Sequence, residues 1–287
     1  MTGSMLGIIG AAVLSLVVLA APSHAARPTL DVIERAQLSR ERALGQTTIP
    51  VYGFKLVRTY PHDINYFTEG LTVRDGVVYE GTGLYGESRL LQYDLATGRV
   101  IHEVRLDKSY FGEGVTLLND TIYQLTYISN IGFTYDRASF QRTGTFRFPT
   151  QGWGLTTDGK YLLMSDGSSA IKFLDPKTLN IERSIFVSDD VGPVGFLNEL
   201  EYADGKLYAN IWETNVIAII APETGRIIGW IDLAGLNPDP KVLQDPFVNN
   251  GIAYNEATHR LIVTGKCWPG LYEIELIPRS PGGSSRP

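Results

Sequence analysis

Short apolar runs separated by polar turns dominate the chain from about residue 51 onward. The runs are four to eight residues long, and the turns between them contain Asp-Gly, Asn-Asp, Thr-Gly or Pro. This spacing is typical of strands, and the region shows no long stretch with the 3.6-residue period of an amphipathic helix. The pattern therefore predicts an all-β protein.

The strand pattern repeats five times. A first hairpin recurs as GLTVRDGVVYEGTG, GVTLLNDTIYQLTY, GLTTDGKYLLMSDG, LEYADGKLYANIWE and IAYNEATHRLIVTGK, and a second hairpin follows in most copies. Equivalent positions are spaced by 44, 39, 46 and 54 residues, at Tyr79, Tyr123, Leu162, Tyr208 and Ile262. Four short strands at this period predict a five-bladed β-propeller with four-stranded antiparallel blades around a central channel. The fifth copy is one strand short, so we expect residues 53–60 to supply that strand.

Two sets of equivalent positions carry chemistry that differs from copy to copy. The first set, near the start of each first strand, is Glu69, Glu113, Trp153, Asn198 and Asn250. The second set, four residues after the aligned position, is Gly83, Tyr127, Asp166, Trp212 and Lys266, and Glu80 directly follows its own aligned tyrosine. Charged groups gathered at one opening cost free energy unless they find partners. The divergence predicts an asymmetric ligand site, and the alternative for each single residue is an ordinary role at a strand end.

Composition excludes several classes of function. The chain has 287 residues and a net charge of -6, and its Lys and Arg residues form no basic stripe. We therefore expect no nucleic-acid partner. Cys267 is the single cysteine, which excludes an intramolecular disulfide and a cysteine-built zinc site.

The beginning of the chain is typical of an export signal. An apolar run of 16 residues, Leu6–Ala21, precedes the small-x-small pattern Ser23-His24-Ala25. We expect a signal peptide over 1–25, a lead-in segment over 26–50, the propeller domain over 51–278 and a flexible tail over 279–287. This predicts a periplasmic or secreted protein without membrane contact after cleavage. An uncleaved membrane anchor is the alternative, because no Lys or Arg precedes the apolar run.

Longer motifs carry a resemblance to a known family. They are FTEGL, YEGTGLYGES, GEGVTLLNDTIYQLTY, GWGLTTDGKYLLMSDGS, LNELEYADGKLYANIW, GWIDL and VTGKCWPGLYEIEL. From about Phe54 to Leu276 the chain resembles the plant-and-bacterial type of glutaminyl-peptide cyclotransferase. The resemblance implies a five-bladed propeller that converts the N-terminal glutamine of a peptide or protein to pyroglutamate and releases ammonia. It also implies no catalytic metal or other cofactor, and we expect a monomer.

The resemblance also implies roles for matching residues. Glu80, in YEGTG, matches the carboxylate that carries the proton. Lys266, Trp212 and Asn198 match donors to the developing oxyanion. The matching substrate-binding positions are Phe67, Glu69, Tyr127 and Trp153.

Three positions depart from the family pattern. Relatives read FTQGL where this chain has Glu69, an aromatic residue where it has Val78, and tryptophan where it has Tyr127. Tyr127 keeps a ring and a donor, whereas Val78 opens space in the pocket. Glu69 adds a second carboxylate near Glu80, and two carboxylates close together raise the pKa of one of the pair.

Two other functional classes remain open at this stage. Glu113, Glu199 and Glu201 either line the channel and hold a calcium ion or bind only backbone amides. A calcium site would be typical of a propeller hydrolase of the lactonase kind, but such a site has no use for Lys266. The departures from the family pattern also leave open a periplasmic scaffold without activity.

Overall fold

The computed structural model describes residue 44, residues 47–236 and residues 248–279. The predicted signal peptide, most of the lead-in segment and residues 280–287 of the predicted tail lie outside these ranges. Every named element within these ranges is a strand, so the described part of the chain is all-β, as predicted. None of the described residues belongs to a helix long and apolar enough to cross a membrane.

Three separate sheets each contain four antiparallel strands in chain order. The first sheet comprises β2 (Thr68–Arg74), β3 (Val77–Thr82), β4 (Arg89–Asp94) and β5 (Val100–Arg105). The second comprises β6 (Gly112–Leu118), β7 (Thr121–Thr126), β8 (Ile131–Asp136) and β9 (Arg142–Arg147). The third comprises β10 (Leu155–Thr157), β11 (Leu162–Met164), β12 (Ala170–Leu174) and β13 (Ile181–Phe186).

The fourth sheet has eight strands, in the order β14-β15-β16-β17-β1-β20-β19-β18. Their bounds are β14 (Leu197–Ala203), β15 (Lys206–Ile211), β16 (Val216–Ile220), β17 (Ile227–Asp232), β1 (Val51–Pro61), β20 (Gly270–Pro278), β19 (Arg260–Gly265) and β18 (Asn249–Asn255). β1 pairs with β20 along nearly its whole length, but meets β17 only at Val51 and Tyr52. The N-terminal strand predicted over 53–60 therefore joins the last three strands, as expected.

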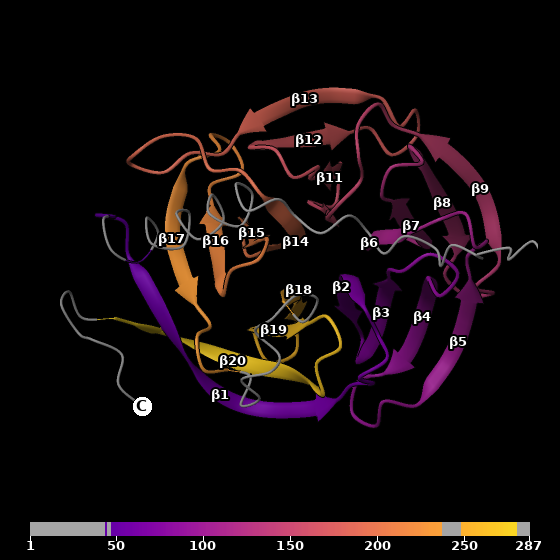
Figure 1. Cartoon of the computed structure of the whole chain (residues 1–287), viewed down its shortest axis with the longest axis horizontal. Coiled ribbons are helices and arrows are strands. Elements are labelled where there is room, and N and C mark those ends of the chain that lie inside the picture. Colours follow the sequence, from indigo (N-terminus) through magenta and orange to yellow (C-terminus); the bar gives the residue numbers. More distant parts are fainter. Residues whose placement is uncertain (1–43, 45–46, 237–247, 280–287) are drawn as a thin grey trace, which may run out of the picture.

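The sheets surround a common centre, with β2, β6, β14 and β18 near the middle and β5, β9, β13 and β17 at the rim (Figure 1). The first strands contact one another in a closed cycle that runs through β2, β6, β10, β14 and β18 and returns to β2. Five hydrophobic clusters of described residues lie between successive sets of four strands. Burial of these clusters is what holds each set against its neighbours.

Glycine allows the inner strands to approach one another closely. A Cβ atom added to Gly70 would lie 2.3 Å from the backbone nitrogen of Val115, and one added to Gly114 would lie 2.5 Å from that of Leu155. Either substitution would therefore force backbone to move. These contacts bring the starts of β2, β6 and β10 together at the centre.

Asp-Gly turns close two of the inner hairpins, as predicted. Both residues of each turn have positive φ, at 55° and 74° for Asp75 and Gly76 and at 49° and 72° for Asp204 and Gly205. Positive φ at both central positions matches the right-handed twist of the flanking strands. The turns thus fix the register in which β2 pairs with β3 and β14 pairs with β15.

Candidate active site

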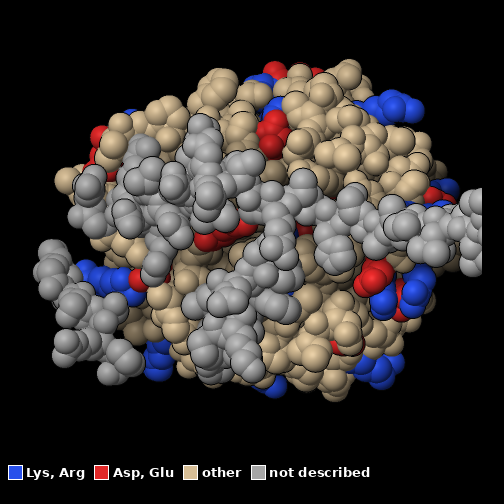
Figure 2. All heavy atoms as spheres, in the orientation of Figure 1, with Lys and Arg blue, Asp and Glu red and all other residues tan. Residues whose placement is uncertain are grey.

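A β-bulge lies at the start of four inner strands. The register shifts between Thr68 and Gly70 in β2, Gly112 and Val115 in β6, Leu197 and Leu200 in β14, and Asn249 and Ile252 in β18. A bulge changes the direction of a side chain relative to a regular strand. The residues within these bulges include Glu69, Glu113, Asn198 and Asn250, four of the positions that the repeats predict. Acidic side chains are visible near the middle of the molecule in Figure 2.

Glu69 and Lys266 form a shielded ion pair. Lys266 Nζ lies 2.7 Å from Glu69 Oε1, and Asn250 Nδ2 donates to Glu69 Oε2 at 3.0 Å. The ammonium also lies 4.6 Å from the centroid of the Phe67 ring, a cation–π distance. Glu69 is only 2% exposed and Lys266 7%. Burial raises the pKa of Glu69, and the charge of Lys266 opposes that rise.

Glu113 is the like-charged neighbour of this pair. Its side chain is buried and accepts no hydrogen bond from the described residues. Burial first, and then the charge of Glu69, raise the pKa of Glu113 well above its ordinary value, while Lys266 opposes the rise. Tyr127 stands nearby, with its ring 5.9 Å from that of Phe111, and burial and the charge of Glu113 raise its pKa. From the sequence we expected Glu69 to act on Glu80, but the carboxyl group whose pKa the charge of Glu69 raises is that of Glu113.

Trp153 and Trp212 form an aromatic corner. Their ring centroids are 5.6 Å apart in an edge-to-face arrangement, and Phe196 lies 6.2 Å from Trp212. The indole N–H of Trp153 donates to Gln151 at 3.0 Å. Asn198 is also buried, and its Oδ1 finds no hydrogen-bond partner among the described residues. A buried amide oxygen without a partner costs free energy, which makes Asn198 a candidate for binding a ligand.

Glu80 lies in a second buried network. Its Oε1 accepts a hydrogen bond from Thr68 Oγ1 at 2.8 Å and lies 3.2 Å from His62 Nε2. Its Oε2 accepts a hydrogen bond from the Tyr93 hydroxyl at 2.7 Å. The main-chain oxygen of Thr68 accepts a hydrogen bond from Asn250 Nδ2 at 2.9 Å. The side-chain amide of Asn250 therefore links the network of Glu80 to that of Glu69. Glu80 is 0% exposed, so its carboxylate is shielded from solvent.

The structure thus brings the predicted residues together in three groups. Phe67, Glu69 and Lys266 form one group, which Tyr127 borders. Trp153 and Trp212 form another. Asn198 adjoins it, because Ser165 Oγ accepts from the amide of Gly154 and donates to the main-chain oxygen of Asn198. Glu80 belongs to a third. Within the described ranges no hydrogen bond, ion pair or ring contact joins Glu80 directly to Lys266, Trp212 or Asn198.

His62 belongs to the Glu80 network, and the repeat comparison missed it. It precedes the first repeat, so it has no counterpart in the other copies. His62 also has no second histidine at a metal-ligand spacing that would mark it. The position of His62, six residues before Thr68 and at the entry to the first hairpin, could have identified it from the sequence.

Glu199 and Glu201 bind backbone amides, one of their two predicted roles. Glu199 accepts from the amides of Leu71 at 3.1 Å and Ile252 at 2.7 Å. Glu201 accepts from the amide of Tyr254 at 2.8 Å. Among the described residues no group of three or more His, Cys, Asp or Glu side chains is arranged to hold a metal ion. Both carboxylates tie one inner strand to its neighbours.

We expect stability to fall as pH rises, in part because of Glu201. Burial raises the pKa of Glu201 to about 8, although hydrogen bonds from Tyr254 and Thr156 oppose the rise. An unfolded glutamate releases its proton at roughly pH 4.3, so between that pH and about 8 the folded state binds more protons than the unfolded state. The free energy of unfolding, measured by denaturant titration, should therefore decrease across this window.

The matched variant is Glu201→Gln, which keeps the shape and one oxygen that can accept from the amide of Tyr254. Across the same pH window, the free energy of unfolding of the variant should fall by less than that of wild type, with a difference on the order of a few kcal/mol. An identical slope in wild type and variant would show that Glu201 is already ionised in the folded protein.

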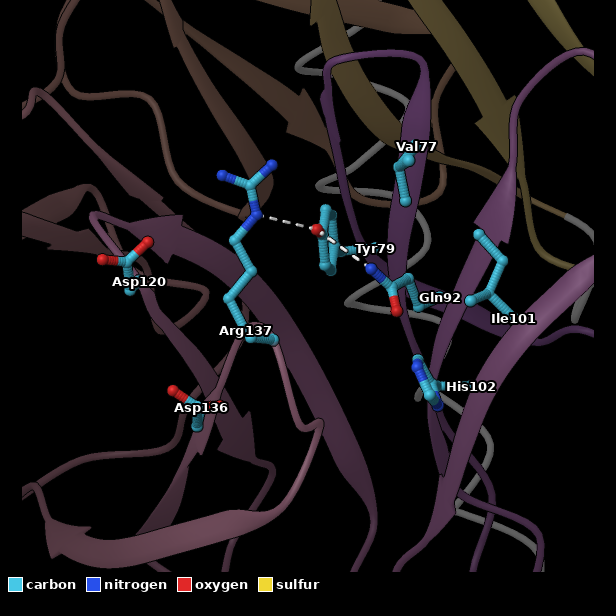
Figure 3. A pocket seen from close by; sticks show the side chains of 9 residues that line it. Val77, Tyr79, Gln92, Ile101, His102, Asp120, Asp136 and Arg137 are labelled. Carbon is cyan, nitrogen blue, oxygen red and sulfur yellow. Dashed lines mark hydrogen bonds between the residues drawn. The ribbon is translucent and has the colours of Figure 1, made fainter.

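A hollow of about 680 Å³ lies between the first and second sheets (Figure 3). The Tyr79 hydroxyl accepts hydrogen bonds from Arg137 Nε and Gln92 Nε2, both at 3.1 Å. Arg137 also pairs with Asp75 at 2.9 Å. The guanidinium group is thus neutralised within the protein, and the hollow contains none of the predicted site residues.

Comparisons with known proteins identify the family. The fold and site define an all-β protein with buried charged groups at the centre of a ring of sheets. The sequence model of the glutamine cyclotransferase family matches residues 29–276. The chain belongs to the glutamine cyclotransferase family, which confirms the resemblance inferred from its motifs.

Two relatives show how far the similarity extends. A protein of Arabidopsis thaliana named glutaminyl-peptide cyclotransferase is 40% identical over 228 residues, covering 77% of this chain and 71% of the relative. The crystal structure of Myxococcus xanthus glutaminyl cyclase matches with a TM-score of 0.75 and 33% identity, covering 81% of this chain and all of that one. Both similarities span most of the residues that form the sheets.

Proposed function

We propose that the protein is a glutaminyl-peptide cyclotransferase that converts the N-terminal glutamine of a peptide or protein to pyroglutamate and releases ammonia. The observation that carries the proposal is the 40% identity with the Arabidopsis enzyme over 77% of the chain. The buried carboxylate of Glu80 and the buried ammonium of Lys266 supply the proton carrier and the cation that this chemistry needs.

The reaction is mainly a task of orientation. The α-amine of the substrate attacks its own side-chain carbonyl carbon, so that a carbon–nitrogen bond forms and closes a five-membered ring. Holding the two groups in attacking geometry removes much of the entropic barrier. Phe67, Trp153 and Tyr127 wall the pocket in this proposal, and Glu69 attracts the substrate's ammonium group.

The reaction also moves one proton. Glu80 takes a proton from the attacking amine and gives it to the amide nitrogen, whose bond to carbon then breaks to release ammonia. The burial of Glu80 supports this role because water is kept from the carboxylate. Lys266, Asn198 and Trp212 donate to the oxygen that becomes negative, and loss of one such donor typically costs ~10²–10³ in rate.

We also propose that the four sheets are five propeller blades, with the eight-stranded sheet counted as two. The closed cycle of five inner strands and the five hydrophobic clusters support this count. Export through the signal over 1–25 to the periplasm or the medium, and action as a monomer, are proposals that rest on the sequence alone.

The test is ammonia release from a Gln-led dipeptide, with and without EDTA. We expect turnover above the spontaneous rate in both conditions, because no step of the proposed mechanism uses a metal. An Asn-led dipeptide of the same second residue is the matched control, and it should release no ammonia above background. Inertness toward every Gln-led peptide would support a scaffold, and turnover abolished by EDTA would support a metal-dependent enzyme.

A further inference from the structure

The ring of His62 is held in one orientation and one tautomer. Its side chain is fully buried, and its Nδ1 lies 2.6 Å from the main-chain oxygen of Trp268. A carbonyl oxygen has no proton to give, so Nδ1 must carry the hydrogen in this contact. Tyr66 packs edge-on against the ring at 5.7 Å. The hydrogen on Nδ1 leaves Nε2 as the nitrogen that faces Glu80.

One proton must lie between His62 and Glu80. Nε2 is 3.2 Å from Oε1. With no proton between them two lone pairs would face each other, and with two protons two hydrogens would collide. The pair is therefore either an imidazolium with a carboxylate or a neutral imidazole with a carboxylic acid. In both forms it has one shared proton and no net charge.

The surroundings of the pair favour the imidazolium form. Burial alone would lower the pKa of His62, but the charge and hydrogen bond of Glu80 and the carbonyl of Trp268 raise it above its ordinary value. Asp63 is the other charged group that raises it. Burial, with the charge of Glu80, also raises the pKa values of Tyr66 and Tyr93, so both hydroxyls stay neutral near pH 7.

We propose that His62 is a positioning residue for Glu80 that leaves a single lone pair, on Oε2, to exchange a proton with the substrate. A carboxylate offers about four lone-pair directions. Thr68 and His62 occupy two on Oε1, and Tyr93 occupies one on Oε2. The proton that Oε2 takes from the substrate amine passes to the leaving nitrogen, while the proton shared with His62 stays in place. This inference rests on the proposed function.

Two variants at position 62 separate the two hydrogen bonds of the ring. His62→Asn puts an amide nitrogen near the place of Nδ1, which keeps the bond to Trp268 and loses Glu80. His62→Gln puts one near the place of Nε2, which keeps a donor to Glu80 but carries no charge and does not titrate.

With a Gln-led dipeptide we expect His62→Asn to lower kcat roughly 10- to 100-fold, no more than the lower end of the ~10²–10⁴ that a general acid–base group itself supplies. KM should change little, and His62→Gln should lose less. In wild type kcat should fall as pH rises through the raised pKa of His62, because the pair then loses its shared proton. His62→Gln should lack this fall. If both variants lose kcat equally and keep the wild-type pH profile, the ring is only structural and the proposal is overturned.

A measurement without substrate tests the pair independently of activity. Nitrogen NMR of the ring nitrogens, assigned by the signals missing from His62→Asn, should show His62 as imidazolium at neutral pH. In Glu80→Gln the imidazolium should appear only at lower pH. A neutral His62 ring in wild type below neutral pH overturns the shared proton, whatever the enzyme does. If wild type is inert but the titration is as expected, the proposed function fails and the His62–Glu80 pair stands.

Discussion

Glu80→Gln should lower kcat for a Gln-led peptide by ~10²–10⁴, the contribution expected of a general acid–base group. An amide cannot take up and release the proton that passes between the amine and the leaving nitrogen. Gln keeps the volume of Glu, and its single amide oxygen can still accept from either Thr68 or Tyr93, so the fold should persist. The measurement is the initial rate of ammonia release over a range of substrate concentrations, which separates kcat from KM.

Tyr93→Phe is the matched control for Glu80→Gln. It removes the hydroxyl that donates to Oε2 but leaves the carboxylate in place. We expect a loss of activity well below that of Glu80→Gln. Wild-type activity in a folded Glu80→Gln protein would show that Glu80 does not carry the proton, and Glu69 would then be the carboxylate to test.

Lys266→Met should reduce both stability and activity strongly. Removing one partner of a buried ion pair typically costs about 3–5 kcal/mol, because the other charge is left without compensation. Glu69 would then stand buried beside Glu113 without its cation. We also expect a loss of ~10²–10³ in kcat if the ammonium stabilises the oxyanion. Denaturant unfolding and the ammonia assay measure the two effects separately.

The double variant Glu69→Gln/Lys266→Met distinguishes the two contributions of the lysine. A neutral amide at position 69 needs no cation, so most of the lost stability should return, while kcat should stay low. Gln has the shape of Glu and keeps one oxygen that can accept from Asn250, so it should fit the fold. If the double variant is as unstable as Lys266→Met, the cost lies in packing around the lysine side chain and not in the unpaired charge.

The order of strands could be predicted from the sequence because each repeat carries its own local signals. Asp-Gly dipeptides between apolar runs predicted the hairpins, and the missing strand of the last repeat predicted β1. The central position of Glu69, Glu113, Asn198 and Asn250 followed from repeat equivalence alone. The turn residues and the repeat spacing were sufficient to predict these features, because both signals can be recognised within a few tens of residues of sequence.

The partners of those side chains could not be predicted in the same way. The bond between Glu69 and Lys266 joins residues 197 positions apart, and its geometry depends on bulges that leave no mark in an alignment of repeats. Val78, expected to open the pocket, is fully buried in the hydrophobic cluster that contains Tyr93. His62 was missed because a residue outside every repeat has no equivalent with which to compare it.

The pairing of β1 with β20 has a consequence for how the molecule is made. Tyr52 lies opposite Pro278, so β1 is synthesised long before β20, the strand with which it pairs along most of its length. Such distant pairing is slow to form, because a long loop must close, at a cost in conformational entropy, before the stabilising contacts between the strands can form. Until β20 has been synthesised, β1 presents an unpaired strand edge, which is prone to aggregate. Premature termination before residue 270 would leave an open ring prone to aggregate.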